Sequence, residues 1–181
     1  MDTIINLYAD RTEKNLNKKM NNQITILRPL PLQKNVVVDF IKANFCEQWA
    51  VESEVAFCNV VPTIFVAILD SKMVEFCCYN ATSMGFLSPI GVVKKFRGMN
   101  IGFSLVNTTL DSMKVAGYAH TIVGSCSNAL QFYTKNFGAQ VIESSKNNSI
   151  YDKVISWKKF IVYYSASWSN YRYGKIRSSD Y

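Results

Sequence analysis

The residues best placed to do chemistry lie in the stretch VVKKFRGMNIGFSL, residues 92–105. An apolar segment runs here through a turn containing Gly98 into an apolar helical pattern that has Gly102 near its start. Such a turn directs free backbone N–H groups at one point, where the positive end of the helix dipole also favours an anion. Arg97 adds a mobile positive charge. The stretch therefore predicts a phosphate site, and the alternative is an ordinary helix start with Asn100 as its N-cap.

Neither of two common phosphate loops fits this stretch. It lacks the Gly-Lys-Ser/Thr of a mononucleotide loop, and it lacks the Gly-x-Gly that directly follows the strand in a dinucleotide fold. The lysine pairs are scattered, but one of them, Lys94-Lys95, directly precedes the turn. The formal net charge of +7 fits an anionic ligand, and it also leaves nucleic acid open as a less favoured partner.

The cysteine and histidine content restricts the chemistry further. The five cysteines are odd in number, none forms Cys-x-x-Cys, and His120 is the only histidine. These features speak against a disulfide framework or a metal site and favour buried thiols in a reducing compartment. Residues 1–19 lack the apolar core of a signal peptide, and no apolar run reaches membrane-spanning length. We therefore expect a cytoplasmic protein without a metal, in which His120 is structural.

The elements that must position the loop are predicted to form one α/β domain of the mixed α+β kind. Hydrophobic spacing predicts strands at 23–28, 63–69, 73–80, 84–93, 118–124 and 139–143. The same spacing predicts helices over 33–57, with a break, and over 101–116 and 128–137. A final strand is expected between Val154 and Tyr164, and residues 1–22, rich in Asn and Lys, are expected to form a flexible arm.

Two local patterns suggest how the strands connect. The turn Asp70-Ser71-Lys72 predicts a hairpin between 63–69 and 73–80. Pro89 and Gly91 interrupt 84–93, which indicates a bulge or a splayed edge. The strand–helix–strand unit over 85–124 should be parallel with a right-handed crossover.

Two motifs in this order resemble the GNAT superfamily of acetyl-CoA-dependent N-acyltransferases. The loop matches the pattern Arg-Gly-x-Gly-Ile-Gly at Arg97, Gly98, Ile101 and Gly102, with Asn100 in place of the middle glycine. The later pattern Ala-x-x-Phe-Tyr-x-Lys is matched by Ala129, Phe132, Tyr133 and Lys135. The resemblance covers about residues 23–157. It departs from the family at Cys126, where Asn is frequent, and at Glu75, where Gly is common.

The resemblance implies a single GNAT-like domain over 23–159, preceded by the arm 1–22 and followed by a C-terminal strand extension or tail over 160–181. The central sheet would be mixed but mostly antiparallel, flanked by helices and splayed between its fourth and fifth strands. The splayed strand would hold the pantetheine arm of acetyl-CoA, and the loop would hold the pyrophosphate. The residues expected to bind the cosubstrate are Gly91, Val92, Val93, Arg97, Gly98, Met99, Asn100, Ile101, Gly102, Phe103, Asn128 and Phe132.

The resemblance also implies acetyl transfer to a primary amine by direct attack in a ternary complex. Tyr133 is the expected general acid, which protonates the leaving thiolate. Glu52, Glu54 and Glu75 are weak candidates for the general base. An acyl-cysteine on Cys126 is a less favoured route, because buried thiols are far commoner and direct transfer is usual in the family.

Several questions stay open at the level of the sequence. Nothing in it identifies the amine acceptor, and a homodimer is compatible with the resemblance. One alternative is a catalytically inactive binding module with this fold. A second alternative is a nucleic-acid binder that uses the basic excess and the aromatic stretch FIVYYSASWSNYRYGKIR near the C-terminus.

Overall fold

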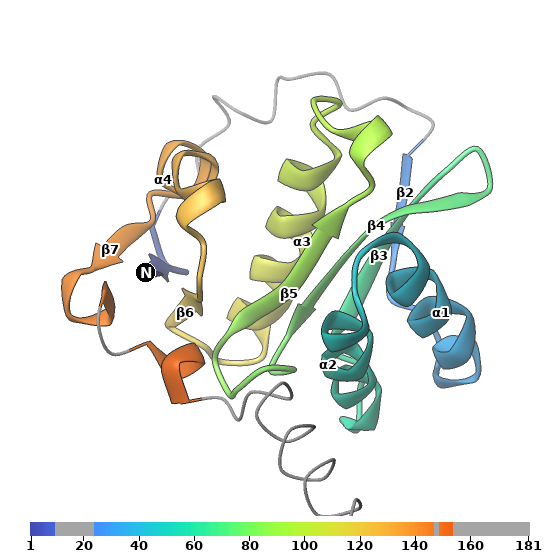
Figure 1. The fold of residues 1–181 in the computed structure, drawn as a ribbon, viewed down its shortest axis with the longest axis horizontal. Helices are drawn as coiled ribbons and strands as arrows, with labels where there is room; N and C mark the ends of the chain where they lie inside the picture. Colours follow the sequence, from blue (N-terminus) through green and yellow to red (C-terminus); the bar gives the residue numbers. More distant parts are fainter. Residues whose placement is uncertain (10–23, 147–148, 154–181) are drawn as a thin grey trace, which may run out of the picture. The chain divides into compact units, whose positions relative to one another are not determined.

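The computed structural model describes residues 1–9, 24–146 and 149–153 (Figure 1). The chain divides into two compact units, Met1–Ser149 and Ile150–Tyr181. Of the second unit, only a 3₁₀ turn at Ile150–Lys153 is described. The strand predicted between 154 and 164 and the extension predicted over 160–181 lie outside the described residues, so the domain boundaries stay predictions. The fold and the site below belong to the first unit.

The first unit contains a four-stranded antiparallel sheet with the order β2-β3-β4-β5. Its strands are β2 (Ile24–Leu27), β3 (Ile64–Leu69), β4 (Lys72–Tyr79) and β5 (Leu87–Val92). Strands β3 and β4 form the predicted hairpin, and its turn uses positive φ at Asp70 and Ser71. The register between β4 and β5 shifts between Cys77 and Tyr79, which confirms the predicted irregularity in the strand that contains Pro89 and Gly91.

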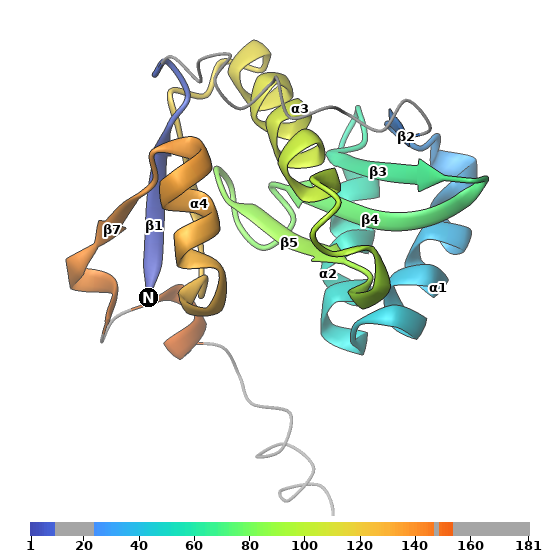
Figure 2. The ribbon, with the colours of Figure 1, turned by 90° about the horizontal axis from the view of Figure 1, so that it is seen from above.

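Helices cover both faces of this sheet (Figure 2). The helical region 33–57 is interrupted as predicted, into α1 (Lys34–Asn44) and α2 (Glu47–Cys58), and these lie on one face. Helix α3 (Ile101–Val115) lies on the other face. None of the helices in the described ranges is long and apolar enough to cross a membrane.

Strand β4 is buried on both faces, and the side chains on each face belong to a different hydrophobic core. Because side chains alternate along a strand, Phe76 and Cys78 pack toward α1 and α2, whereas Cys77 and Tyr79 pack toward α3. Glu75 shares the α3 side with Cys77 and is completely buried. A charged residue type in such a position is unusual, and it becomes important for the site below.

A second, three-stranded antiparallel sheet has the order β6-β1-β7. Its strands are β6 (His120–Val123), β1 (Asp2–Asn6) and β7 (Gln140–Ile142), and helix α4 (Leu130–Phe137) connects β6 to β7. His120 is the first residue of β6, which lies within the strand predicted over 118–124.

The prediction of a flexible arm over residues 1–22 is wrong at Asp2–Asn6, because this segment is the central strand of the second sheet. Asp2 anchors it: the Asp2 carboxylate accepts hydrogen bonds from Ser149 Oγ at 2.9 and 3.0 Å and from the Ser125 amide at 2.9 Å. The Asp2 amide donates to Ser145 Oγ at 2.7 Å. Residues 10–22 of the predicted arm lie outside the described ranges.

The two sheets part between β5 and β6. Within the described ranges, the only bridge recorded between the sheets is Phe86 to Ile122, and it is parallel, as predicted for the strand–helix–strand unit. Beyond this bridge, toward Val92, the outer edge of β5 has no strand beside it in the described residues. The fold is therefore the expected α+β arrangement. The sheets are splayed between β5 and β6, which correspond to the fourth and fifth strands of the predicted set.

Candidate active site

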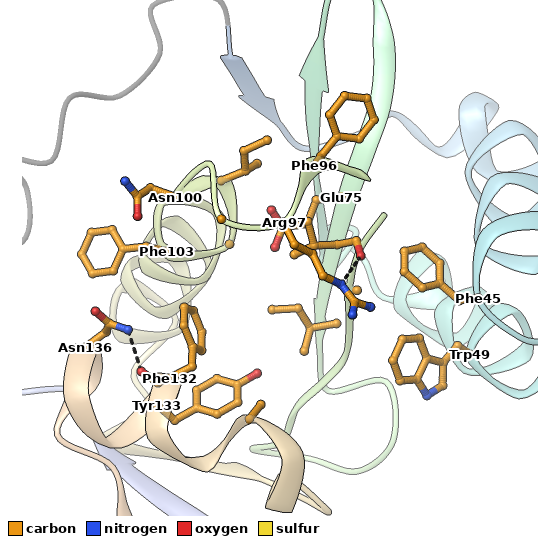
Figure 3. Close-up of a pocket in the computed structure, with 17 residues that line it drawn as sticks. Phe45, Trp49, Glu75, Phe96, Arg97, Asn100, Phe103, Phe132, Tyr133 and Asn136 are labelled. Carbon is orange, nitrogen blue, oxygen red and sulfur yellow. Dashed lines mark hydrogen bonds between the residues drawn. The ribbon is translucent and has the colours of Figure 1, made fainter. Parts of the chain in front are cut away.

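The predicted anion loop adopts the backbone geometry that its glycines suggest. Gly98 has a positive φ of 81°, and Asn100 is left-handed, with φ 61° and ψ 10°. Asparagine is among the few non-glycine residues that adopt this conformation readily, so it replaces the missing glycine at modest cost. Helix α3 begins directly afterwards at Ile101. Asn100 is the N-cap residue, but its side chain makes no capping hydrogen bond and points away from Glu75 and Arg97 (Figure 3).

The start of α3 consequently keeps its anion-binding character. The first N–H groups of a helix have no partner within the helix, and the Asn100 side chain does not satisfy them. The first intrahelical bond runs from the Ser104 amide to the Asn100 carbonyl at 3.3 Å. Arg97 lies beside this end and donates from Nε to the Val92 carbonyl at 3.3 Å, which ties the loop to the end of β5.

The loop opens into a pocket with a volume of about 460 Å³. The pocket lies where the two sheets part, and α3, α4, β5 and the α1–α2 junction contribute to its walls (Figure 3). The sequence-predicted site residues that line it are Glu75, Gly91, Val92, Arg97, Gly98, Asn100, Ile101, Gly102, Phe103, Phe132 and Tyr133. Residues from five separate elements therefore meet in one cavity.

Glycine at two positions of the wall permits a close approach. A Cβ at Gly102 would lie 3.3 Å from Glu75 Oε1 and 3.5 Å from a methyl group of Val92. A Cβ at Gly91 would lie 2.5 Å from the ring of Phe45, which is closer than real atoms approach. The first glycine brings the start of α3 onto the sheet, and the second brings the α1–α2 junction onto β5.

Glu75 is the unusual group of the pocket. Its side chain is completely buried, and neither carboxyl oxygen has a hydrogen-bond partner. Burial raises the pKa of this carboxyl from 4.5 to about 8, because the charged form loses its hydration without gaining a partner. Glu75 is therefore mostly neutral at pH 7.

Tyr133 supplies the second titratable group. It lies on α4, and its hydroxyl points away from the helix into the pocket (Figure 3). Burial raises the pKa of the phenol above its usual value, with smaller contributions from Cys77, Cys126 and Glu75. The hydroxyl therefore stays protonated and available as a hydrogen-bond or proton donor across the physiological range.

Five predicted residues do not line the pocket: Glu52, Glu54, Val93, Met99 and Asn128. Glu52 is half-buried, and burial raises its pKa, although Oε2 accepts a hydrogen bond from Thr82 at 2.8 Å. Glu54 forms an exposed ion pair of 2.7 Å with Lys34. Of the three proposed bases, only Glu75 therefore faces the cavity. Within the described ranges, no group of three or more acidic, cysteine or histidine side chains could hold a metal ion.

Sequence reasoning missed part of the wall, namely Phe45, Trp49, Ile90, Phe96, Ala129 and Asn136. Asn136 is tied back to its own helix, because its amide donates to the Phe132 carbonyl at 2.8 Å. Phe45 and Trp49 flank the break between α1 and α2, which the sequence does show. Nothing local indicates that this break faces β5, so their role in the wall depends on the tertiary packing.

The comparisons with known proteins agree with this geometry. The model of the acetyltransferase (GNAT) family matches residues 35–139. No curated protein matches the chain at a significant level. The open sheet, with the loop before α3 at its parting, has the GNAT fold, and the chain belongs to the acetyltransferase (GNAT) family.

Three solved structures illustrate the likeness in fold. One is a glucosamine N-acetyltransferase region of a fungal multi-domain β-N-acetylglucosaminidase, with TM-score 0.60, 16% identity and 77% coverage of this chain. Another is a GCN5-related N-acetyltransferase from Sphaerobacter thermophilus, with TM-score 0.57, 16% identity and 77% coverage. This chain spans 19% and 47% of their respective lengths. An aminoglycoside acetyltransferase from an uncultured soil sample has TM-score 0.50 and 17% identity, with 65% of this chain and 90% of that chain covered.

Proposed function

We propose that this protein is an N-acetyltransferase that moves the acetyl group of acetyl-CoA to a primary amine by direct attack in a ternary complex. The observation that carries the proposal is that the start of α3, the open edge of β5 and the Tyr133 hydroxyl meet in one pocket. Family membership supports the acetyl donor.

The wall suits each part of acetyl-CoA. The free N–H groups of the first turn of α3, together with Arg97, would hold the diphosphate. Gly98 leaves room, since no atom lies within 4 Å of the position its Cβ would take. The edge of β5 at Ile90 and Gly91, which has no strand beside it in the described residues, would offer backbone groups to the amides of the pantetheine arm. Acetyl-CoA supplies an activated acetyl group as its thioester.

Two side chains would carry out the proton transfers. The amine nitrogen forms the new bond to the acetyl carbon while the carbon–sulfur bond breaks, and the departing thiolate takes a proton from Tyr133. The amine must lose a proton, and Glu75 is the acidic side chain of the pocket wall that could accept it, directly or through water. Only the ionised carboxylate can accept the proton, and with a pKa of about 8 it is the minor form at pH 7. Positioning of the amine against the thioester contributes further.

Calorimetric titration with CoA tests the donor site first. We expect saturable binding to the full chain, and an absence of binding at several hundred micromolar would favour an inactive module with this fold. Tyr133→Phe should then lower kcat about a hundredfold or more and leave CoA affinity nearly unchanged. Tyr8→Phe is the matched control, because Tyr8 is exposed and lies outside the pocket. An unaltered kcat in Tyr133→Phe would remove the acid role from this residue.

A further inference from the structure

The pocket has two chemically different ends (Figure 3). Gly98 and Asn100 at the start of α3 make one end suited to an anion, whereas the Arg97 side chain is directed away from Asn100 and donates to the Val92 carbonyl. Phe45 and Trp49 at the α1–α2 junction make the other end, and each is half-buried, so that part of each ring remains accessible. If the proposed function holds, the first end and the edge of β5 take acetyl-CoA. The aromatic end is then left for the amine.

The aromatic end is a rigid wall. Phe45, Trp49 and Phe76 form one cluster, with ring centroids 5.2 Å apart for Phe45 and Phe76, 5.7 Å for Phe45 and Trp49, and 6.1 Å for Trp49 and Phe76. Phe76 is completely buried in the sheet and supports the other two rings. The Phe45 ring also lies directly against the backbone of Gly91. Rings held in this way offer a preformed surface on which an apolar or aromatic body stacks.

The charges of the wall disfavour a polycation. Among the described residues that line the pocket, Glu75 is the sole acidic side chain, and Arg97 is positive. The acidic residues of the neighbouring helix α2 have other partners: Glu47 pairs with Lys42 at 2.8 Å, Glu52 accepts from Thr82, and Glu54 pairs with Lys34. Each additional ammonium group would therefore enter the pocket without an ionised carboxylate to meet it, at a further desolvation cost.

A ligand with one amine on an apolar body fits both the aromatic wall and the scarcity of acidic side chains in the pocket. The aromatic faces attract a single cationic amine as well as an apolar ring, since cation–π attraction and stacking use the same surface. The volume of about 460 Å³ must also hold the reactive end of the donor, which favours a compact acceptor. We propose that the acceptor is a small arylalkyl primary amine with one positive charge, whose ring packs on Phe45 and Trp49. This assignment rests on the proposed function.

A panel of amines tests the proposal with the full chain and saturating acetyl-CoA. Thiol release is followed with 2-phenylethylamine, tryptamine, hexylamine, spermidine, kanamycin and a lysine-containing peptide. We expect the highest kcat/KM for the two arylalkylamines, about tenfold or more above spermidine and kanamycin. A preference for spermidine, kanamycin or the peptide overturns the acceptor class and leaves acetyl-CoA turnover, hence the proposed function, intact. A failure of acetyl-CoA to bind overturns both.

Variants locate the acceptor on the wall. Phe45→Leu and Trp49→Leu should each raise KM for 2-phenylethylamine about tenfold, as expected for the loss of an aromatic pair, and leave KM for acetyl-CoA within about twofold. Phe40→Leu is the matched control, since Phe40 belongs to the same aromatic cluster, at 6.1 Å from Phe45, but does not line the pocket. Equal effects of all three substitutions, or no effect of the first two, contradict the assignment.

One measurement needs no variant. The neutral analogue 2-phenylethanol should inhibit competitively against the amine and not against acetyl-CoA, whereas ethylene glycol should not inhibit at the same concentration. Inhibition that competes with acetyl-CoA instead would place the aromatic wall in the donor site and overturn the assignment.

Discussion

Replacing Glu75 by glutamine should change how the stability of the protein depends on pH. Glutamine has nearly the same shape as a protonated glutamate but cannot ionise. In the folded protein, burial raises the pKa of Glu75 from 4.5 to about 8. Between these two values the folded chain keeps a proton that the unfolded chain has released. The free energy of unfolding therefore falls as pH rises through this window, by about 1.4 kcal/mol per pH unit for this one group.

The whole window corresponds to about 5 kcal/mol, a large part of the 5–15 kcal/mol that typically stabilises a domain. Urea unfolding at pH 5, 6, 7 and 8 measures the free energy of unfolding of wild type and Glu75→Gln. Other titrating groups are common to both proteins and cancel in the difference. We expect the free energy of unfolding of the variant, relative to that of the wild type, to increase steadily from pH 5 to pH 8.

A difference between wild type and Glu75→Gln that stays constant from pH 5 to 8 would refute the reasoning. It would mean that the Glu75 carboxyl titrates with the same pKa in the folded and unfolded chains. The carboxyl would then be hydrated or paired in solution, in contrast to its burial without a hydrogen-bond partner.

Further predictions concern the loop and the wall. Asn100→Gly should keep CoA affinity, measured by calorimetry, within about threefold of the wild type, because glycine adopts the same left-handed backbone. Asn100→Val should lower the free energy of unfolding in urea by about 1–2 kcal/mol, because valine does not adopt that backbone readily. Gly98→Ala should also cost about 1–2 kcal/mol there, from backbone strain alone, since no atom lies within 4 Å of the new Cβ. Gly91→Ala should cost about 1–3 kcal/mol because its Cβ collides with the Phe45 ring, and Phe45→Ala should partly restore stability in the double variant; purely additive effects would contradict the collision.

Local sequence signals predict the parts of the fold that depend on local contacts. The β3–β4 hairpin has a short polar turn between apolar runs, and α3 has regular helical spacing with Gly117 just beyond its end, so both are recognisable in isolation. Strand β1 gives no comparable signal. It is five residues long, its partners lie more than a hundred residues away, and a buried Asp2 anchors it. Only the assembled chain reveals why this polar N-terminal segment is ordered.

The same distinction separates the two ends of the pocket. The residues of the predicted anion loop lie in one continuous stretch of sequence, so the spacing of its glycines and Arg97 is enough to recognise it. The aromatic wall needs β5 to meet the α1–α2 junction, and the only local trace of that contact is Gly91, which is equally compatible with a bulge. Phe45 and Trp49 therefore look like ordinary core residues until the elements are brought together.

Glu75 connects the fold of this protein to its proposed chemistry. Its carboxyl lies beside the first turn of α3, where a Cβ on Gly102 would come within 3.3 Å of Oε1. An ionised carboxylate there would compete with a diphosphate for the positive end of the helix, because both are anions. Burial keeps the carboxyl neutral below about pH 8 and thereby leaves that end free for the donor. The proton that favours folding would then also favour acetyl-CoA binding, and its loss at higher pH would weaken both.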